Sequence, residues 1–144
     1  MTLDFAEHIV LVCGSRTYDN PREVRVQLNL LPEGTWILHG ACRGADTLAA
    51  EIAWNIGLPT MGIPAKWGLG ESYDRGAGFA RNRRMLEEFH PQACLAFYDT
   101  KELEDSRGTA GMVELAREAG IPVRAFGKGT KLRQLLVWRK EGIL

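Results

Sequence analysis

Net charge, cysteine clusters and long hydrophobic runs are all missing from this chain of 144 residues. Lysine and arginine total 18, as do aspartate and glutamate, so the formal net charge is zero and no global attraction to nucleic acid or membrane surfaces is expected. No stretch approaches the ~20 apolar residues that span a membrane, and the apolar run over residues 9–13 is too short for the core of a signal peptide. These absences favour a cytoplasmic protein with no membrane partner.

Cysteines and histidines are few and scattered. Cys13, Cys42 and Cys94 have neither the number for a disulfide framework nor the spacing of a zinc knuckle. The three histidines also lie far apart, so we expect no metal site and no cofactor. His39 stands at the end of a predicted strand, where it is either a candidate base or a core residue.

Apolar runs and amphipathic patterns alternate along the chain. The apolar runs cover residues 8–13, 36–39, 60–64, 93–98 and 121–126, as is typical of strands buried on both faces. Helical patterns start at Pro21, with Asn20 as N-cap, and cover residues 45–56, 77–89 and 109–119. The alternation predicts an α/β fold: a single Rossmann-like domain over residues 1–126, with a mainly parallel sheet of about five strands and helices on both faces.

Two segments fall outside this alternation. Residues 65–76 form a long glycine-rich loop, and loops of that length in compact domains are often functional. Residues 127–144 form a basic tail, in which Leu132, Leu135 and Leu136 make one helical stripe. We expect a helix there that packs on the domain or lies at an oligomer interface.

Distinctive residues gather where the predicted strands end. Ligands of open α/β sheets bind at that edge, where glycines let backbone amides approach an anion and helix N-termini add free donors. Gly108 and Thr109 fit a phosphate cradle, although such a pair is also a plain turn and cap, and Asp46 is either a cap or an acceptor for a ligand hydroxyl. The candidate ligand-binding residues are Gly14, Ser15, Arg16, Gly40, Gly44, Asp46, Trp67, Arg81, Asn82, Gly108 and Thr109.

Arginines are concentrated at the start of the third predicted helix. No acid lies between Arg75 and Arg84, although the helix dipole disfavours cations at that end by roughly 0.3–1 kcal/mol each. An anionic ligand facing Arg81 or Arg84 would explain the departure. A P-loop, a G-x-G-x-x-G fingerprint and a G-x-S-x-G elbow are all absent, which excludes the commonest nucleotide-binding and serine-hydrolase motifs.

Five motifs in order resemble one known family. They are G-S-R-T-Y, H-G-A-x-R-G-A-D-x-L-A-A-E, P-A-x-W, A-G-x-x-R-N-x-x-M and G-T-x-x-M, spread over residues 9–126. This arrangement is similar to the YspA-like, cpYpsA-related branch of the SLOG superfamily, whose relatives include the LOG phosphoribohydrolases and the Smf/DprA proteins. The resemblance implies a Rossmann-like domain that binds a nucleotide or nucleotide-derived ligand at the strand ends, and it implies a homodimer or higher homo-oligomer.

The resemblance to the LOG enzymes is incomplete at the catalytic positions. Arg81 and Asn82 match the Arg-Lys of their helix motif, and Gly108 and Thr109 match the Gly-Thr of their phosphate loop. Gly111 and Met112 stand where those enzymes carry an acid, and Glu114 is one turn too far along. The LOG-type catalytic acid is therefore missing, and the catalytic residues stay unassigned.

Three hypotheses for function follow. The first is a sensor or ligand-capture module for a nucleotide or nucleotide-derived ligand, with Trp67 or Tyr73 available to stack on a base. The second is a nucleotide-processing hydrolase that cleaves a glycosidic or phosphate bond. The third is single-stranded DNA binding as in the Smf/DprA relatives, which the zero net charge disfavours. The candidate acids of the enzyme hypothesis are Asp46, Glu71, Asp74 and Glu114.

Overall fold

The computed structural model of the protein describes residues 8–74 and 76–127. Five strands form one sheet in the order β3-β2-β1-β4-β5, and all four neighbouring pairs are parallel. The first strand lies in the middle, and the chain winds outward from it in both directions, as in doubly wound α/β folds. The predicted fold class is confirmed. The strands are β1 (Ile9–Gly14), β2 (Trp36–His39), β3 (Thr60–Gly62), β4 (Ala93–Phe97) and β5 (Val123–Phe126).

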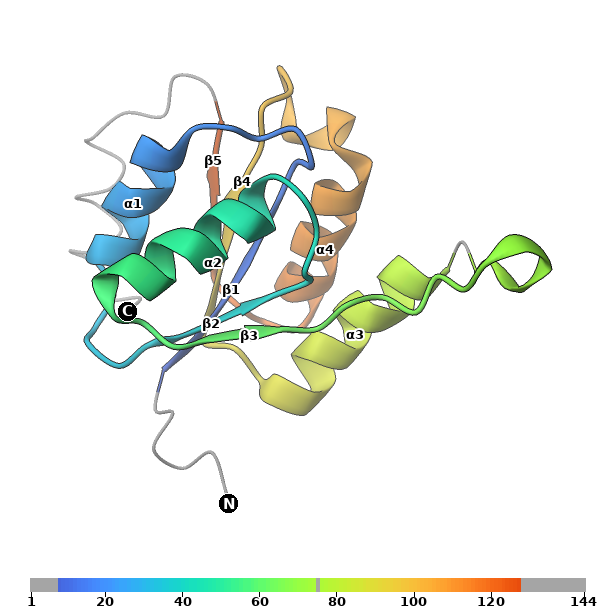
Figure 1. Ribbon diagram of the computed structural model, residues 1–144, viewed down its shortest axis with the longest axis horizontal. Coiled ribbons are helices and arrows are strands. Elements are labelled where there is room, and N and C mark those ends of the chain that lie inside the picture. The colour runs from blue at the N-terminus through green and yellow to red at the C-terminus, as the bar shows by residue number, and fades with distance from the viewer. Residues whose placement is uncertain (1–7, 75, 128–144) are drawn as a thin grey trace.

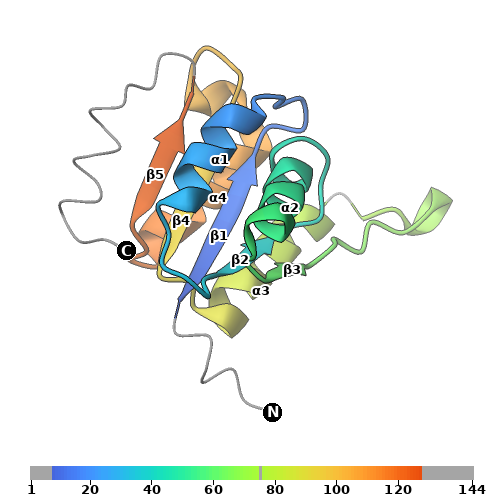
Figure 2. The same ribbon diagram turned by 60° about the vertical axis from the view of Figure 1, so that its left-hand side comes forward.

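Helices cover both faces of the sheet (Figures 1 and 2). On one face α1 (Pro21–Asn29) and α2 (Ala45–Ile56) pack on a buried cluster that includes Val10 and Phe97. On the other face α3 (Ala77–Phe89) and α4 (Arg107–Glu118) pack on a second cluster around Leu11 and Met85. Because both faces are buried, the central strands are apolar at successive positions instead of alternating with polar residues.

The helix boundaries follow local signals in the sequence. Pro21 is the first residue of α1, and the Asn20 side chain caps it by accepting a hydrogen bond from the Glu23 amide at 3.3 Å. Gly57 ends α2 in the left-handed conformation, with a φ of 83°. The predicted N-cap at Asn20 is confirmed.

Some predicted ends shift by one or two residues. The third strand ends at Gly62 instead of residue 64, because Pro64 has no amide to continue the ladder. The fifth strand begins at Val123, immediately after Pro122. Helix α4 begins at Arg107, two residues before its predicted start. Gly108 and Thr109 therefore lie within the first turn of the helix.

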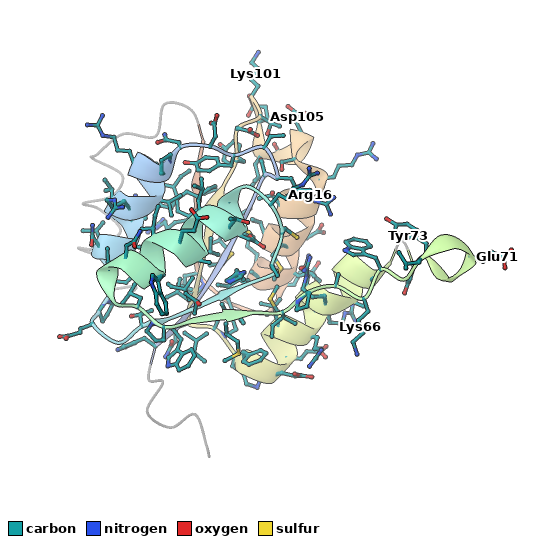
Figure 3. The ribbon with its side chains drawn as sticks, viewed as in Figure 1. Arg16, Lys66, Glu71, Tyr73, Lys101 and Asp105 are labelled. Carbon is teal, nitrogen blue, oxygen red and sulfur yellow. The ribbon has the colours of Figure 1, made fainter. Side chains whose placement is uncertain are left out.

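The segment between β3 and α3 reaches away from the body of the domain (Figures 1 and 3). It contains one short 3-10 helix, η2 (Gly70–Ser72), and Figure 3 shows Glu71 at its outer end. Trp67, at its base, lies against α3: a Cβ atom added to Gly78 would meet the indole at 2.8 Å. The segment is thus anchored beside the carboxyl edge of the sheet.

Part of what the sequence predicts lies outside the described residues. This applies to Arg75 and to the helix expected in the tail, of which the structure describes Gly127. Within the described part of the chain, no helix combines the length and apolar character needed to cross a membrane.

Candidate ligand-binding site

A cavity of about 580 Å³ lies where β1, β2 and β4 end. Every candidate ligand-binding residue except Gly44 lines it, so the structure gathers residues from five separate motifs around one space. The sequence prediction did not include several further lining residues. Among them are Thr17, Phe79, Asp99, Thr100, Asp105, Ser106, Arg107 and Gly111.

Glycine is needed at positions 14 and 44 because neighbouring atoms of the protein leave no room for a side chain there. The space that a side chain would take is filled by the protein and is not open to a ligand. Gly44 has a φ of 76°, and a Cβ atom there would lie 2.2 Å from the carbonyl oxygen of Ser15. A Cβ atom on Gly14 would lie 2.1 Å from the carbonyl oxygen of Phe97 and 2.5 Å from the Cβ of Ala45. Both glycines let α2 approach the end of β1, and this approach brings Asp46 to the cavity.

The loop between β2 and α2 donates its amides to Asp46. Oδ2 of this carboxylate accepts hydrogen bonds from the N–H of Gly40 at 2.9 Å and of Cys42 at 3.2 Å. The side chain is 5% exposed, and burial raises its pKa to about 6 against the opposing effect of these two hydrogen bonds and of Arg81 and Arg16. The amides of Gly40 and Cys42 therefore bind the protein's own carboxylate and are not available to an anionic ligand.

Arg81 connects three parts of the site. Its Nη1 donates hydrogen bonds to the carbonyl oxygens of Gly40 and, at 3.2 Å, of Ile63, while its Nε donates to Oδ1 of Asn82 at 2.7 Å. A Cβ atom on Gly40 would lie 2.6 Å from Nη1. Arg81 lines the cavity but is also a structural brace between the ends of β2, β3 and the start of α3.

The other arginines of α3 are occupied at the surface. Arg84 forms an ion pair with Glu88 one turn later, at 2.9 Å, and its side chain is 50% exposed. The guanidinium of Arg83 lies 5.2 Å from the centre of the Phe79 ring. Neither arginine lines the cavity. Of the two arginines predicted to face an anionic ligand, only Arg81 is in position to do so.

Trp67 is in contact with other side chains. Its ring stacks with that of Tyr73, with centroids 6.0 Å apart and planes inclined by 13°, and the guanidinium carbon of Arg16 lies 5.8 Å from its centre. Tyr73 does not line the cavity. Trp67 and Arg16 thus form one wall of the cavity, supported from the projecting segment.

A chain of hydroxyl groups joins β1 to the start of α4. The Ser15 and Ser106 hydroxyls share a hydrogen bond of 3.1 Å, and Ser106 donates to the Thr109 hydroxyl at 2.8 Å. Ser15 Oγ also accepts the amide of Asp99, whose carboxylate accepts a hydrogen bond from Thr17. Asp99 lies two residues beyond β4, so the rule that ligands bind at strand ends would have identified it.

The first turn of α4 faces the cavity with its amides uncapped. Ser106 is the N-cap residue, but its hydroxyl binds Thr109 and makes no capping hydrogen bond with a helix amide. A Cβ atom on Gly108 or on Gly111 would meet no atom within 4 Å. Arg107 lines the same region. Amides that no side chain of the described residues caps, the positive end of the helix dipole and a guanidinium make this the anion-compatible end of the cavity.

The carboxylates that line the cavity within the described part of the chain are those of Asp46, Asp99 and Asp105. Of the candidate acids, Asp46 lines the cavity, whereas Glu71, Asp74 and Glu114 do not.

Burial and Arg81 lower the pKa of His39, whose Nδ1 accepts the Ala41 amide, so this histidine is a neutral core residue. The pKa of the Cys13 thiol is raised, mainly by its hydrogen bond with Cys94 and next by burial. Within residues 8–74 and 76–127, no three His, Cys, Asp or Glu side chains are grouped to hold a metal ion.

Comparison with known sequences identifies relatives. A family model described as the YspA, cpYpsA-related SLOG family matches residues 8–70. The Gene 61 protein of Mycobacterium phage D29 is 33% identical over 127 residues, an alignment that covers 82% of this chain and 95% of that protein.

A solved structure shares the fold. The X-ray structure of DNA processing protein A (DprA) from Streptococcus pneumoniae matches with a TM-score of 0.66 and 21% sequence identity. The match covers 98% of this chain and 59% of the DprA chain, so this chain spans little more than half of that protein. At this identity the likeness concerns the fold alone.

Proposed function

The chain belongs to the YspA, cpYpsA-related SLOG family, and we propose that it binds a nucleotide or nucleotide-derived ligand in the cavity at the carboxyl edge of its sheet. It would act as a sensor or ligand-capture module. The observation that carries the proposal is the uncapped first turn of α4, which faces a cavity of about 580 Å³ beside Arg16 and Arg107. A cavity of this size suits a small molecule.

Opposite charges at the site favour a ligand with distinct polar groups. Arg16, Arg107 and the amides of Gly108 and Thr109 would hold a phosphate, because an anion is stabilised by both cations and free backbone donors. Asp46, Asp99 and Asp105 line the same cavity and would disfavour a ligand that is anionic throughout. A nucleoside monophosphate, which carries one charged group on a neutral sugar and base, matches this arrangement.

The proposal can be tested by thermal shift with AMP, GMP, ADP, ADP-ribose, NAD and cyclic nucleotides. A ligand at 100 times its Kd stabilises by roughly 2.7 kcal/mol, a rise in Tm of a few degrees for a domain of this size. The informative variants are Arg16→Ala and Arg107→Ala, since Arg81→Ala would also remove the brace between strands. Arg25→Ala, exposed on α1 and away from the cavity, is the matched control. If no compound raises the Tm of the wild type, the proposal is wrong.

A hydrolase is the second candidate function. Asp46 favours it, since this lining carboxyl has a pKa of about 6, in the range where one group can both hold and release a proton near neutral pH. Incubation with the ligand that gives the largest thermal shift, followed by chromatography for free base or free phosphate, separates an enzyme from a binding module. An unchanged ligand after prolonged incubation with stoichiometric protein would exclude hydrolysis.

Three other sequence predictions stay predictions. They are the cytoplasmic location, the assembly into a homodimer or higher oligomer, and the binding of single-stranded DNA. An oligonucleotide in the same thermal-shift panel tests the last of these, and sedimentation tests the assembly.

A further inference from the structure

One carboxylate oxygen of Asp46, Oδ1, is available to accept a hydrogen bond from a ligand. It lies in the first turn of α2, is 5% exposed and lines the cavity. Oδ2 takes both loop amides, whereas Oδ1 accepts no hydrogen bond within the described part of the chain. An ionised carboxylate has about four acceptor positions and no donor, so capacity remains for a ligand group that donates.

The surroundings of Asp46 restrict what that ligand group can be. Arg81 and Arg16 are the cations near this carboxylate. Two nitrogens of the Arg81 guanidinium, Nε and Nη1, are occupied by Asn82, Gly40 and Ile63, and Nη2 contacts the Cys42 sulfur at 3.8 Å. A phosphate placed here would face a fixed carboxylate. A neutral hydroxyl would instead complete its hydrogen bonding, while the phosphate binds at the uncapped start of α4.

We propose that Asp46 accepts a hydrogen bond from a ribose hydroxyl of the bound ligand, so that the site selects ribonucleotides over deoxynucleotides. This inference rests on the proposed function of the same cavity and names the sugar that it takes. Selection of this kind arises because removing the hydroxyl leaves a buried charged acceptor without its partner. The same preference would disfavour DNA as the ligand.

Calorimetric titration tests the inference with AMP, GMP, CMP and UMP and with their 2′-deoxy and 2′,3′-dideoxy counterparts. For the nucleotides that bind, loss of a hydrogen bond to a charged group should weaken binding by roughly 10–100-fold. We expect the fall at the 2′-deoxy step; a fall only at the dideoxy step would place the hydrogen bond on the 3′-hydroxyl and refute the selection of ribonucleotides over deoxynucleotides. Equal affinity of ribo and dideoxy forms would overturn this inference and leave the proposed function intact. Failure of all four ribonucleotides and of every compound in the thermal-shift panel to bind would overturn both.

The Asp46→Asn variant tests whether this side chain causes the preference for ribonucleotides. Its amide can keep one oxygen on the loop amides, but it then presents a donor to the ligand, so the ribose preference should fall to within a few-fold. Glu51→Gln makes the same change of charge at an exposed position of α2 that does not line the cavity, and it should keep the full preference. Folding of both variants is checked by circular dichroism. A folded Asp46→Asn that still discriminates would refute the role of Asp46, and the wild-type series holds even if this variant does not fold.

Discussion

The guanidinium of Arg81 fills the place that a side chain at residue 40 would need. Nη1 lies 2.6 Å from the position of a Cβ atom on Gly40 and donates a hydrogen bond to the carbonyl oxygen of the same residue. This contact joins the start of α3 to the end of β2. Glycine is needed at position 40 because the Arg81 guanidinium occupies the space beside it. A ligand does not need that space.

Gly40→Ala should therefore destabilise the protein by about 1–3 kcal/mol, the usual cost of overpacking a filled site. The displaced guanidinium would lose its hydrogen bonds to Gly40 and Ile63. Urea unfolding measures the change. Gly111→Ala is the control, since its Cβ atom meets nothing within 4 Å and a helical alanine gains roughly 0.5–1 kcal/mol over glycine. Equal effects of the two substitutions would contradict this account of Gly40.

The ionisation of Asp46 should make stability fall with rising pH. Burial raises its pKa from 3.8 to about 6, so the folded protein keeps a proton that the unfolded chain releases. The free energy of unfolding of the wild type, relative to that of Asp46→Asn, should decrease as pH rises from 3.8 to about 6 and stay level above. The total change is about 3 kcal/mol. Denaturation series across this range provide the measurement. A relative stability that increases with pH would show that the hydrogen bonds and arginines around Asp46 affect its pKa more than burial does.

Trp67 should report on ligand binding through its fluorescence. Its indole lines the cavity and lies beside Arg16, so a phosphate bound to that arginine changes the charge next to the ring. The emission change seen with a bound nucleotide should disappear in Trp67→Phe, a substitution that keeps an aromatic ring for Tyr73 to stack on. Trp54→Phe, on an 82% exposed residue of α2, should leave the change intact. A signal that survives in Trp67→Phe would place the ligand elsewhere.

Native alkylation should distinguish the three thiols. Cys94 is buried, and the pKa of Cys13 is raised by its hydrogen bond with Cys94 and by burial, so both should react slowly with iodoacetamide. Cys42 is partly exposed and lines the cavity, so we expect it to be labelled first and to be protected by a bound ligand. Peptide mass spectrometry over time gives the order. Early labelling of Cys94 would indicate that the sheet opens readily.

Patterns between near neighbours in the sequence were sufficient for the fold. Apolar runs mark strands buried on both faces, and Asn20 and Gly57 mark helix ends through hydrogen bonds and backbone angles that involve only a few adjacent residues. The rule that parallel strands point their carboxyl ends to one edge then predicted which motifs would meet. For this reason all but one of the candidate binding residues line the same cavity.

The task of each residue within that cavity was decided by the tertiary structure alone. Gly40 and Arg81 are 41 positions apart, and Ser15 and Ser106 are 91 apart, so no local pattern shows that the first pair forms a brace or that the second pair joins β1 to the start of α4. The sequence identifies residues able to bind an anion. Which of them are already satisfied by the protein, as the amides of Gly40 and Cys42 are by Asp46, depends on distances that exist only after the strands pair and the helices pack.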